Sequence, residues 1–362
     1  MPRSPTYLAN TFSPRRPSDQ FRNLITGGKI EGRMHLSLED SMALQRAIEM
    51  SAILRHSFSW QVLLIVLAVT GCAPSTQPNV INLAALEPLP VARSAEVVPL
   101  RVAVAAVISP QGTAESYGAL FDYLSDRLNR PVELVQRRTY AEVNELLRTG
   151  EIDVAFVCTS AYIAGHDEFG MELLAAPQVN GESVYYSVLI VPAHSPARSM
   201  ADLQGKVFAF TDPMSTSGRI YPTSLVLDLG STPEQFFSRT FYTYSHDDAI
   251  HAVADGVADG AAVDSLVLEF ALARDPTLTN RVRVIHRSPA FGIPPVVIRP
   301  DTRPQLHAEL QDILLTMADD PHGREALARL GYDGFVLIDD SAYNSVRDLT
   351  ASVTPFLADI QP

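Results

Sequence analysis

The stretch Leu100-Arg-Val-Ala-Val-Ala-Ala-Val107 opens the repeating pattern that decides the fold class. It is a short apolar run of the kind that forms a buried strand, and an amphipathic segment follows it at 117–129. A second amphipathic segment at 140–149 lies between two more short apolar runs and ends at Gly150. Strands that alternate with helices in this way are typical of an α/β domain with a mostly parallel sheet.

The same pattern begins again after about residue 195. A longer apolar run at 184–191 is expected to leave the first sheet, and the last part of the chain is assigned back to it. We therefore expect a two-lobed α/β protein with a ligand cleft between its lobes. Lobe 1 is predicted at 99–193 and lobe 2 at 194–288, and 289–362 is predicted to return to lobe 1.

An apolar stretch at 58–71 lies ahead of the predicted lobes. It is too short for a bilayer span of about 20 residues and is interpreted as the core of a signal peptide. Its end, Val69-Thr70-Gly71-Cys72, resembles the lipobox of bacterial lipoproteins, in which a lipid is attached to the cysteine sulfur. The resemblance implies an extracytoplasmic protein anchored to the membrane at Cys72. The alternative is a buried apolar helix that ends in Gly-Cys.

A start at Met50 places the signal peptide at 50–71. Residues 1–49 are then interpreted as an over-called leader. Residues 72–98 follow as a lipidated tether that begins with prolines and polar residues.

Charge excludes one large class of partners. Residues 73–362 carry 20 Lys/Arg and 36 Asp/Glu, a formal charge of −16, with Lys206 as their one lysine. Binding to nucleic acid or to anionic lipid depends on clustered Lys/Arg, so neither is expected as a partner. Two cysteines give no disulfide framework, and a monomer is expected. Any anion must be held by a local arrangement of donors.

Such donors occur in Thr211-Asp-Pro-Met-Ser-Thr-Ser-Gly-Arg-Ile-Tyr-Pro222, which lies between a predicted strand and a predicted helix. Ser215, Thr216 and Ser217 supply hydroxyls where a helix begins with unpaired N–H groups, an arrangement that suits an anion. Gly218 is expected to let the ligand approach the backbone closely. The alternative is an ordinary serine N-cap.

This stretch resembles the Asp-Pro-x-Ser-Thr-Ser-Gly signature of the phosphonate-, phosphite- and phosphate-binding proteins of ABC transporters, the PhnD-like family. Other matching motifs follow in the same order over about residues 99–350, among them Tyr185-Tyr-Ser-Val-Leu-Ile-Val, Ser245-His-Asp-Asp-Ala and Ala262-Val-Asp-Ser265. The resemblance implies the type II periplasmic-binding-protein fold and capture of a small oxyanion for an ABC permease.

The resemblance also implies which side chains hold the oxyanion. Carried over, they are the Ser215-Thr216-Ser217 run, Tyr140, Tyr185 and His246. A histidine beside an oxyanion is expected to be protonated, because the charged form gains the interaction. The alternatives are half-buried aromatics for the tyrosines and an exposed helix cap for the histidine.

The chain departs from the family where relatives that bind aminoalkyl phosphonates pair the ligand's ammonium with acidic residues. Leu266 and Pro294 stand at these places, so a compact oxyanion is expected rather than an amine. Asp264 is expected to accept a hydrogen bond from a ligand that still carries a proton.

Cys158 and Thr159 follow the third predicted strand, at the sheet edge where ligands of open α/β folds bind. A cysteine here resembles the arsenite-responsive branch of the family, which suggests an alternative function: a sensor that signals to a membrane histidine kinase. The other interpretation of Cys158 is a small buried apolar residue.

Enzyme motifs are absent from the sequence: it has no phosphate loop, no Gly-x-Ser-x-Gly turn and no His-Glu-x-x-His helix. An enzyme would have to use His246 with Asp264, which are better explained as ligand contacts. No catalysis, no cofactor and no metal are therefore expected.

Overall fold

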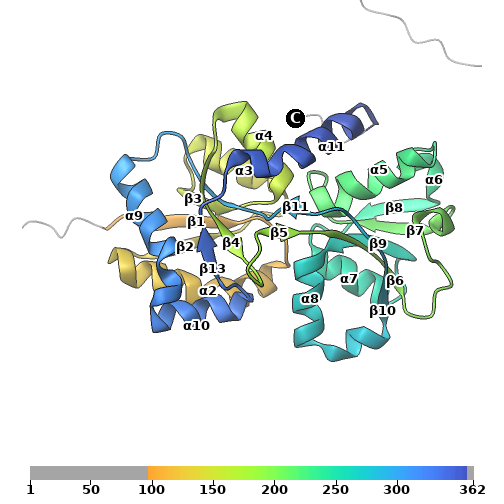
Figure 1. Cartoon of the computed structure of the whole chain (residues 1–362), viewed down its shortest axis with the longest axis horizontal. Helices are drawn as coiled ribbons and strands as arrows, with labels where there is room; N and C mark the ends of the chain where they lie inside the picture. Colours follow the sequence, from red (N-terminus) through yellow and green to blue (C-terminus); the bar gives the residue numbers. More distant parts are fainter. Residues whose placement is uncertain (1–96, 357–362) are drawn as a thin grey trace, which may run out of the picture. The chain divides into compact units, whose positions relative to one another are not determined.

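Residues 97–356 of the computed structural model form two mixed β-sheets and a two-stranded link between them (Figure 1). The predicted leader, signal peptide and lipidated Cys72 lie outside these described residues, as does the predicted tether up to residue 96.

Lobe 1 contains a six-stranded sheet in the order β13-β4-β12-β3-β1-β2. Its strands are β1 (Leu100–Val104), β2 (Val132–Val135), β3 (Val154–Phe156), β4 (Glu172–Gln178), β12 (Val296–Ile298) and β13 (Gly334–Val336). Its helices are α2 (Pro110–Leu128), α3 (Tyr140–Thr149), α4 (Thr159–Phe169), α9 (Pro304–Leu315) and α10 (Pro321–Leu330).

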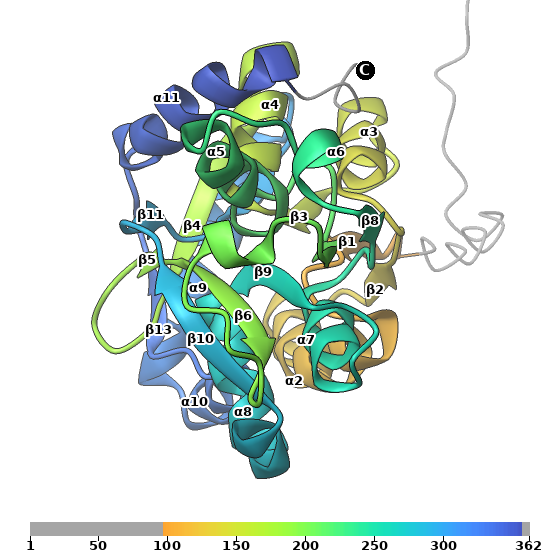
Figure 2. The same cartoon turned by 90° about the vertical axis from the view of Figure 1, so that its right-hand side faces the viewer.

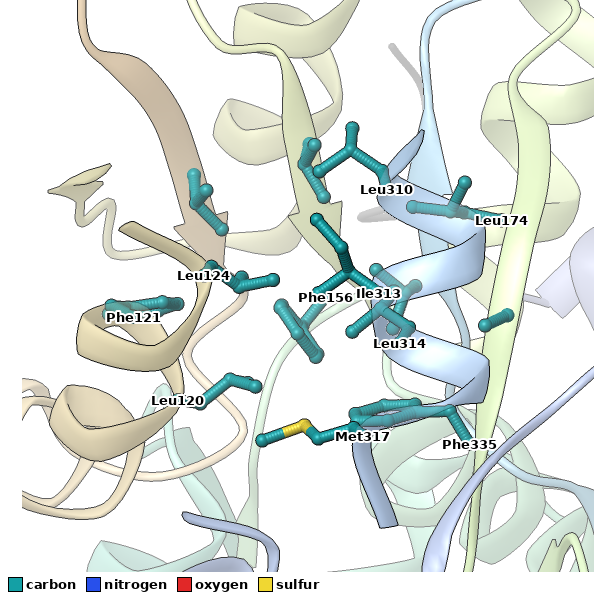
Figure 3. Close-up of a cluster of buried hydrophobic side chains, with 14 of the residues drawn as sticks. Leu120, Phe121, Leu124, Phe156, Leu174, Leu310, Ile313, Leu314, Met317 and Phe335 are labelled. Carbon is teal, nitrogen blue, oxygen red and sulfur yellow. The ribbon is translucent and has the colours of Figure 1, made fainter. Parts of the chain in front are cut away.

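The sheet of lobe 1 has a core on each face. On one face the side chains of α2 and α9 meet around Phe156 of β3 (Figure 3). On the other face α3 and α4 pack against the same strands. The sheet is therefore held rigidly between two helical layers.

Lobe 2 contains a five-stranded sheet in the order β10-β6-β9-β7-β8. Its strands are β6 (Ser187–Pro192), β7 (Val207–Phe210), β8 (Arg239–Tyr242), β9 (Gly260–Asp264) and β10 (Val282–Arg287). Its helices are α5 (Tyr221–Asp228), α6 (Pro233–Phe236), α7 (His246–Ala254) and α8 (Ser265–Arg274), and a π-helical turn, η3 (Thr216–Ile220), precedes α5.

The chain crosses between the sheets on β5 (Val184–Tyr185) and β11 (Phe291–Gly292), which pair antiparallel between the two lobes (Figure 1). The run at 184–191 was expected as one strand, but β6 pairs in the sheet of lobe 2. The first crossing therefore lies at β5, earlier in the chain than the expected boundary at residue 193. The last part of the chain returns to the first sheet through β12 and β13.

Each sheet has a parallel part, in which a helix connects successive strands, and an antiparallel part around the strand that enters from the other lobe. β1 pairs parallel with β2 and β3, and β7 pairs parallel with β8 and β9. β12 and β6 arrive from the other lobe and run antiparallel to their neighbours.

One further helix joins the lobes near the C-terminus. α11 (Asn344–Val353) contacts α4 of lobe 1 and also α5 and η3 of lobe 2 (Figure 2). The lobes are thus connected by α11 as well as by the crossing strands β5 and β11, which we call the hinge strands. Within residues 97–356, no helix combines the length and apolar character needed to cross a membrane.

Candidate functional site

The predicted site residues lie mainly at helix starts that follow strands. Tyr140 begins α3, Cys158 caps α4, Ser215 caps η3, His246 begins α7 and Asp264 caps α8. Each start presents N–H groups that its own helix does not use, and the helix dipole makes that end partly positive. We call the following set the cradle: Tyr140, Cys158, Tyr185, Ser215, Thr216, Ser217, His246 and Asp264.

The Ser-Thr-Ser run is fully buried, and hydrogen bonds to neighbouring residues hold its conformation. Ser215 Oγ accepts a hydrogen bond from the Gly218 N–H at 3.0 Å, and Ser187 Oγ donates to the Ser217 carbonyl at 2.7 Å. Ser217 Oγ is buried and has no hydrogen-bond partner among the described residues. Ser215 is therefore the N-cap residue, and the Ser217 hydroxyl is the one that the fold leaves without a partner.

Gly218 has a different role from the one predicted. A Cβ at this position would lie 1.8 Å from Thr211 Oγ1, so the space beside the glycine is filled by Thr211, the residue that follows β7. Gly218 permits a tight strand-to-helix connection, and the prediction that it admits the ligand is wrong.

His246 connects lobe 2's own site residues. Its Nδ1 accepts a hydrogen bond from the Asp264 N–H at 3.0 Å, and its Nε2 lies 3.4 Å from Ser215 Oγ. Because a backbone N–H can only donate, Nδ1 carries no proton and Nε2 is the nitrogen that donates. Burial lowers the pKa of His246 to about 3, so the ring is neutral in this structure, and its protonation beside an oxyanion stays a prediction.

Two tyrosine hydroxyls in the cradle are buried without a well-formed hydrogen bond. Tyr140 and Tyr185 are fully buried, and neither hydroxyl has a partner within hydrogen-bonding geometry among the described residues, although the Thr159 and Thr216 hydroxyls lie near that of Tyr185. Burial raises the pKa of both well above the ordinary value, so both hydroxyls keep their protons and can donate. Buried polar groups in proteins are normally paired, and an unpaired one costs about 1 to 3 kcal/mol. Tyr140, Tyr185 and Ser217 therefore form a set of donors without an acceptor.

Cys158 lies on the lobe 1 side of the cradle. Its sulfur is 4.0 Å from Thr216 Oγ1, and the next residues extend the contact: the Ser160 N–H donates to Thr216 Oγ1 at 3.1 Å, and Ser160 Oγ donates to the Met214 carbonyl. Burial raises the pKa of the Cys158 thiol, which is therefore protonated. Thr159 uses its hydroxyl elsewhere, because Oγ1 donates to the Gly292 carbonyl in hinge strand β11 at 2.8 Å.

Hydrogen bonds from several backbone groups join the lobes around the cradle. The Tyr140 N–H of lobe 1 donates to Asp212 Oδ2 of lobe 2 at 3.1 Å, and the Ser109 N–H donates to Asp247 Oδ1 at 2.8 Å. The His246 N–H donates to the Val107 carbonyl at 2.9 Å. Sequence reasoning did not assign these bridging roles, although Asp212 stands inside the recognised motif.

The charges in and beside the cradle are acidic. Asp264 is 3% exposed, and burial raises its pKa to about 7, while a hydrogen bond from the Leu266 N–H opposes that shift. Burial likewise raises the pKa of Asp212 to about 6. Arg219 follows the Ser-Thr-Ser run, but its guanidinium lies over the Phe210 ring, 4.3 Å from the ring centroid. The cradle can therefore offer an anion only neutral donors and helix starts.

Metal ligation finds no support in the described residues. Across residues 97–356, no three His, Cys, Asp or Glu side chains gather in a way that could hold a metal ion.

Comparison with known proteins gives one consistent result. The profile of the family described as "ABC transporter, phosphonate, periplasmic substrate-binding protein" matches residues 102–343. The phosphonates-binding periplasmic protein of Escherichia coli K12 is 26% identical over 215 residues, which cover 58% of this chain and 63% of that protein. This match spans less than two thirds of the E. coli protein.

A second relative and two solved structures belong to the same kind of protein as the family model. The phosphate-import protein PhnD of Mycolicibacterium smegmatis is 26% identical over 246 residues, covering 64% of this chain and 73% of that protein. A binding protein of an ABC phosphonate transporter from Pseudomonas aeruginosa has a TM-score of 0.67 at 23% identity, over 71% of this chain and 87% of its own. The methylphosphonate complex of PhnD1 from Prochlorococcus marinus has a TM-score of 0.65 at 18% identity, over 70% and 98%. These structures confirm the predicted fold.

Proposed function

Because the chain belongs to the family of phosphonate periplasmic substrate-binding proteins of ABC transporters, we propose that it captures a small phosphate-, phosphite- or phosphonate-type oxyanion between its lobes and delivers it to a permease. The family consists of transport binding proteins and works outside the cytoplasm. The observation that carries the proposal is the set of three buried hydroxyls without partners, on Tyr140, Tyr185 and Ser217.

The donor set suits a tetrahedral oxyanion. The hydroxyls of Tyr140, Tyr185 and Ser217 can donate hydrogen bonds from different directions, and the dipoles of the helices that begin at the cradle make its surroundings partly positive without adding a full charge. Helix starts with free N–H groups bind phosphate-like anions without a cation. This explains how a chain with a net charge of −13 can hold an anion.

Ligand binding and lobe closure are coupled in this proposal. Tyr140 belongs to lobe 1, Ser217 belongs to lobe 2, and Tyr185 lies on the hinge strand β5. A ligand that accepts hydrogen bonds from all three stabilises the arrangement in which the lobes meet. The closed form is then the form that a permease distinguishes from the empty one.

The test is calorimetric titration of the purified protein in detergent with phosphate, phosphite and methylphosphonate. Tyr140→Phe and Tyr185→Phe each remove one donor, and each should weaken the best ligand about 10- to 100-fold, because hydrogen bonds to charged groups contribute about 1.5 to 3 kcal/mol. Tyr123→Phe is the matched control, since its hydroxyl is also buried without a partner but lies on α2 outside the cradle. Equal affinities in all three variants would remove the ligand from the cradle.

The remaining parts of the proposal concern location and partner. A lipid on Cys72 would hold the protein at the membrane, and it would act there as a monomer. A sensor that engages a histidine kinase would use the same cradle. The specific observation in its favour is the buried Cys158 thiol beside Thr216, which provides a soft ligand for trivalent arsenic.

A further inference from the structure

A cavity of about 90 Å³ lies between the lobes and shares Asp264 with the cradle. Lobe 2 contributes Leu266, Val267 and Phe270 from α8 to its wall, and lobe 1 contributes Tyr117, Pro294 and Tyr332 among others. Val157, which precedes Cys158, also lines it. The cavity is therefore next to the cradle on both lobes.

The polar groups of this cavity already have partners. The Tyr117 and Tyr332 hydroxyls lie 3.4 Å apart and pair with each other. Ser116 Oγ accepts a hydrogen bond from the Arg274 guanidinium at 3.5 Å. Apart from Ser116, Tyr117, Tyr332 and Asp264, the lining residues are apolar, and Asp264 is the one lining residue with an ionisable carboxyl group. An ammonium group placed here would find Asp264 alone, whereas a hydrocarbon group would find apolar side chains on most sides.

Asp264 lies between the cradle and the cavity and belongs to both. Its backbone N–H donates to His246, which in turn lies against Ser215, while its side chain borders the cavity. A phosphonate whose oxygens occupy the cradle has its fourth substituent, the carbon on phosphorus, free to leave past Asp264. The adjoining space is then available to that substituent.

We propose that this cavity holds an uncharged apolar substituent of the ligand, so that the protein prefers short alkylphosphonates to inorganic phosphate and to aminoalkylphosphonates. This inference rests on the proposed function. A water needs roughly 10 to 15 Å³ of such volume, so a cavity of about 90 Å³ has room for several water-sized groups and hence for a short hydrocarbon chain. The compact oxyanion expected from Leu266 and Pro294 alone leaves this volume unused.

The experiment titrates the full chain in detergent with phosphate and with methyl-, ethyl-, propyl- and butylphosphonate. Affinity should rise about fourfold for each added methylene, which is the transfer free energy of a buried CH₂ of about 0.8 kcal/mol. The sharpest comparison is propylphosphonate against 2-aminoethylphosphonate, which have the same number of heavy atoms. Propylphosphonate should bind at least tenfold more tightly.

A pair of variants at Leu266 separates charge from size. Leu266 is the second residue of α8, where an added carboxylate is compatible with the helix dipole. Leu266→Asp should weaken propylphosphonate and reverse the preference toward 2-aminoethylphosphonate. Leu266→Asn, the uncharged control, should weaken propylphosphonate without that reversal.

The outcomes distinguish the two proposals. If phosphate and methylphosphonate bind but affinity stays flat or falls along the series, the cavity proposal is overturned and the proposed function stands. Tighter binding of 2-aminoethylphosphonate than of propylphosphonate by the wild type also overturns it. If none of the phosphorus oxyanions binds, the proposed function fails and the cavity proposal fails with it.

Discussion

Asp264→Asn tests whether the acid at the edge of the cradle is held protonated by the fold. The substitution keeps the size of the side chain and an oxygen that can accept from the Leu266 N–H, as Asp264 does at 2.7 Å. It removes the titrating proton. The pKa of Asp264 is about 7 in the folded protein, because of burial, and an aspartate in the unfolded chain has a pKa of about 3.9.

The sign of the effect follows from proton counting. Between pH 4 and pH 7 the folded protein holds a proton on Asp264 that the unfolded chain has lost, so the stability of the wild type falls as pH rises through this window. A difference of about 3 pKa units corresponds to about 4 kcal/mol of lost stability by pH 8, of which roughly a third is already lost at pH 5. The asparagine variant does not titrate at this position. Its stability relative to the wild type should therefore increase by about 2 to 3 kcal/mol between pH 5 and pH 8.

Two other buried groups titrate in the same range and cancel in this comparison. Asp212, with its pKa raised to about 6, also lowers stability as pH rises, whereas His246, with its pKa lowered to about 3, raises it. Both are present in the wild type and in the variant. The difference between the two proteins thus isolates Asp264, provided that neither neighbour shifts with the substitution.

The assay is thermal melting of both proteins without ligand at several pH values. For a protein of this size, about 1 kcal/mol moves the melting temperature by about 2 to 4 °C, so the gap should widen by about 5 to 10 °C from pH 5 to pH 8. Asp122→Asn, at an exposed position on α2, is the control and should give parallel curves. Parallel curves for Asp264→Asn would refute the assignment of a buried protonated acid.

Three further predictions follow from the same residues and from the N-terminal motif. Ser217→Ala should leave the melting temperature nearly unchanged, since Oγ has no partner to lose, but should weaken the best phosphorus oxyanion by about 1 to 3 kcal/mol in calorimetry. Cys158→Ser should weaken arsenite far more than phosphite or phosphate, and a wild type that binds no arsenite assigns the thiol a packing role. Cys72→Ser should move the protein from the membrane to the soluble fraction or leave it unprocessed; a wild type that is soluble and carries no lipid contradicts the anchor.

One helix could be predicted from sequence almost to the residue, whereas the helix expected at 117–129 begins earlier, as α2 at Pro110 after the N-cap Ser109. The helix predicted at 140–149 is α3, because Thr139 and Glu142 form a capping box at its start and Gly150 ends it in the left-handed region with φ 78°. By contrast, α4 and α8 went unrecognised. The apolar residues of α4 and α8 do not follow a single helical face, so neither segment shows the amphipathic period that marks a helix.

The cradle could be identified from sequence only through the family motifs, since its donors are far apart in the chain. Tyr140 belongs to lobe 1 and the Ser-Thr-Ser run to lobe 2, and the hydrogen bond from the Tyr140 N–H to Asp212 that joins these segments forms only in the folded chain. The tautomer of His246 could not be predicted for a related reason. It is set by the Asp264 N–H, which lies 18 residues further along the chain and faces the ring only in the folded structure.

The charges around the cradle link the choice of ligand to the protonation of Asp264 and of the ligand itself. Tyr140, Tyr185 and Ser217 can each donate but bring no positive charge, and His246 is neutral. A bound anion therefore lies beside a carboxyl group with a pKa near 7 and no opposing cation in the cradle. The negative ligand disfavours ionisation of that carboxyl, because two like charges at close range in a buried site repel strongly. If the cradle binds an anion as proposed, we expect a proton to be kept on either Asp264 or the ligand, and we expect an apolar substituent in the adjoining cavity to add affinity without adding charge.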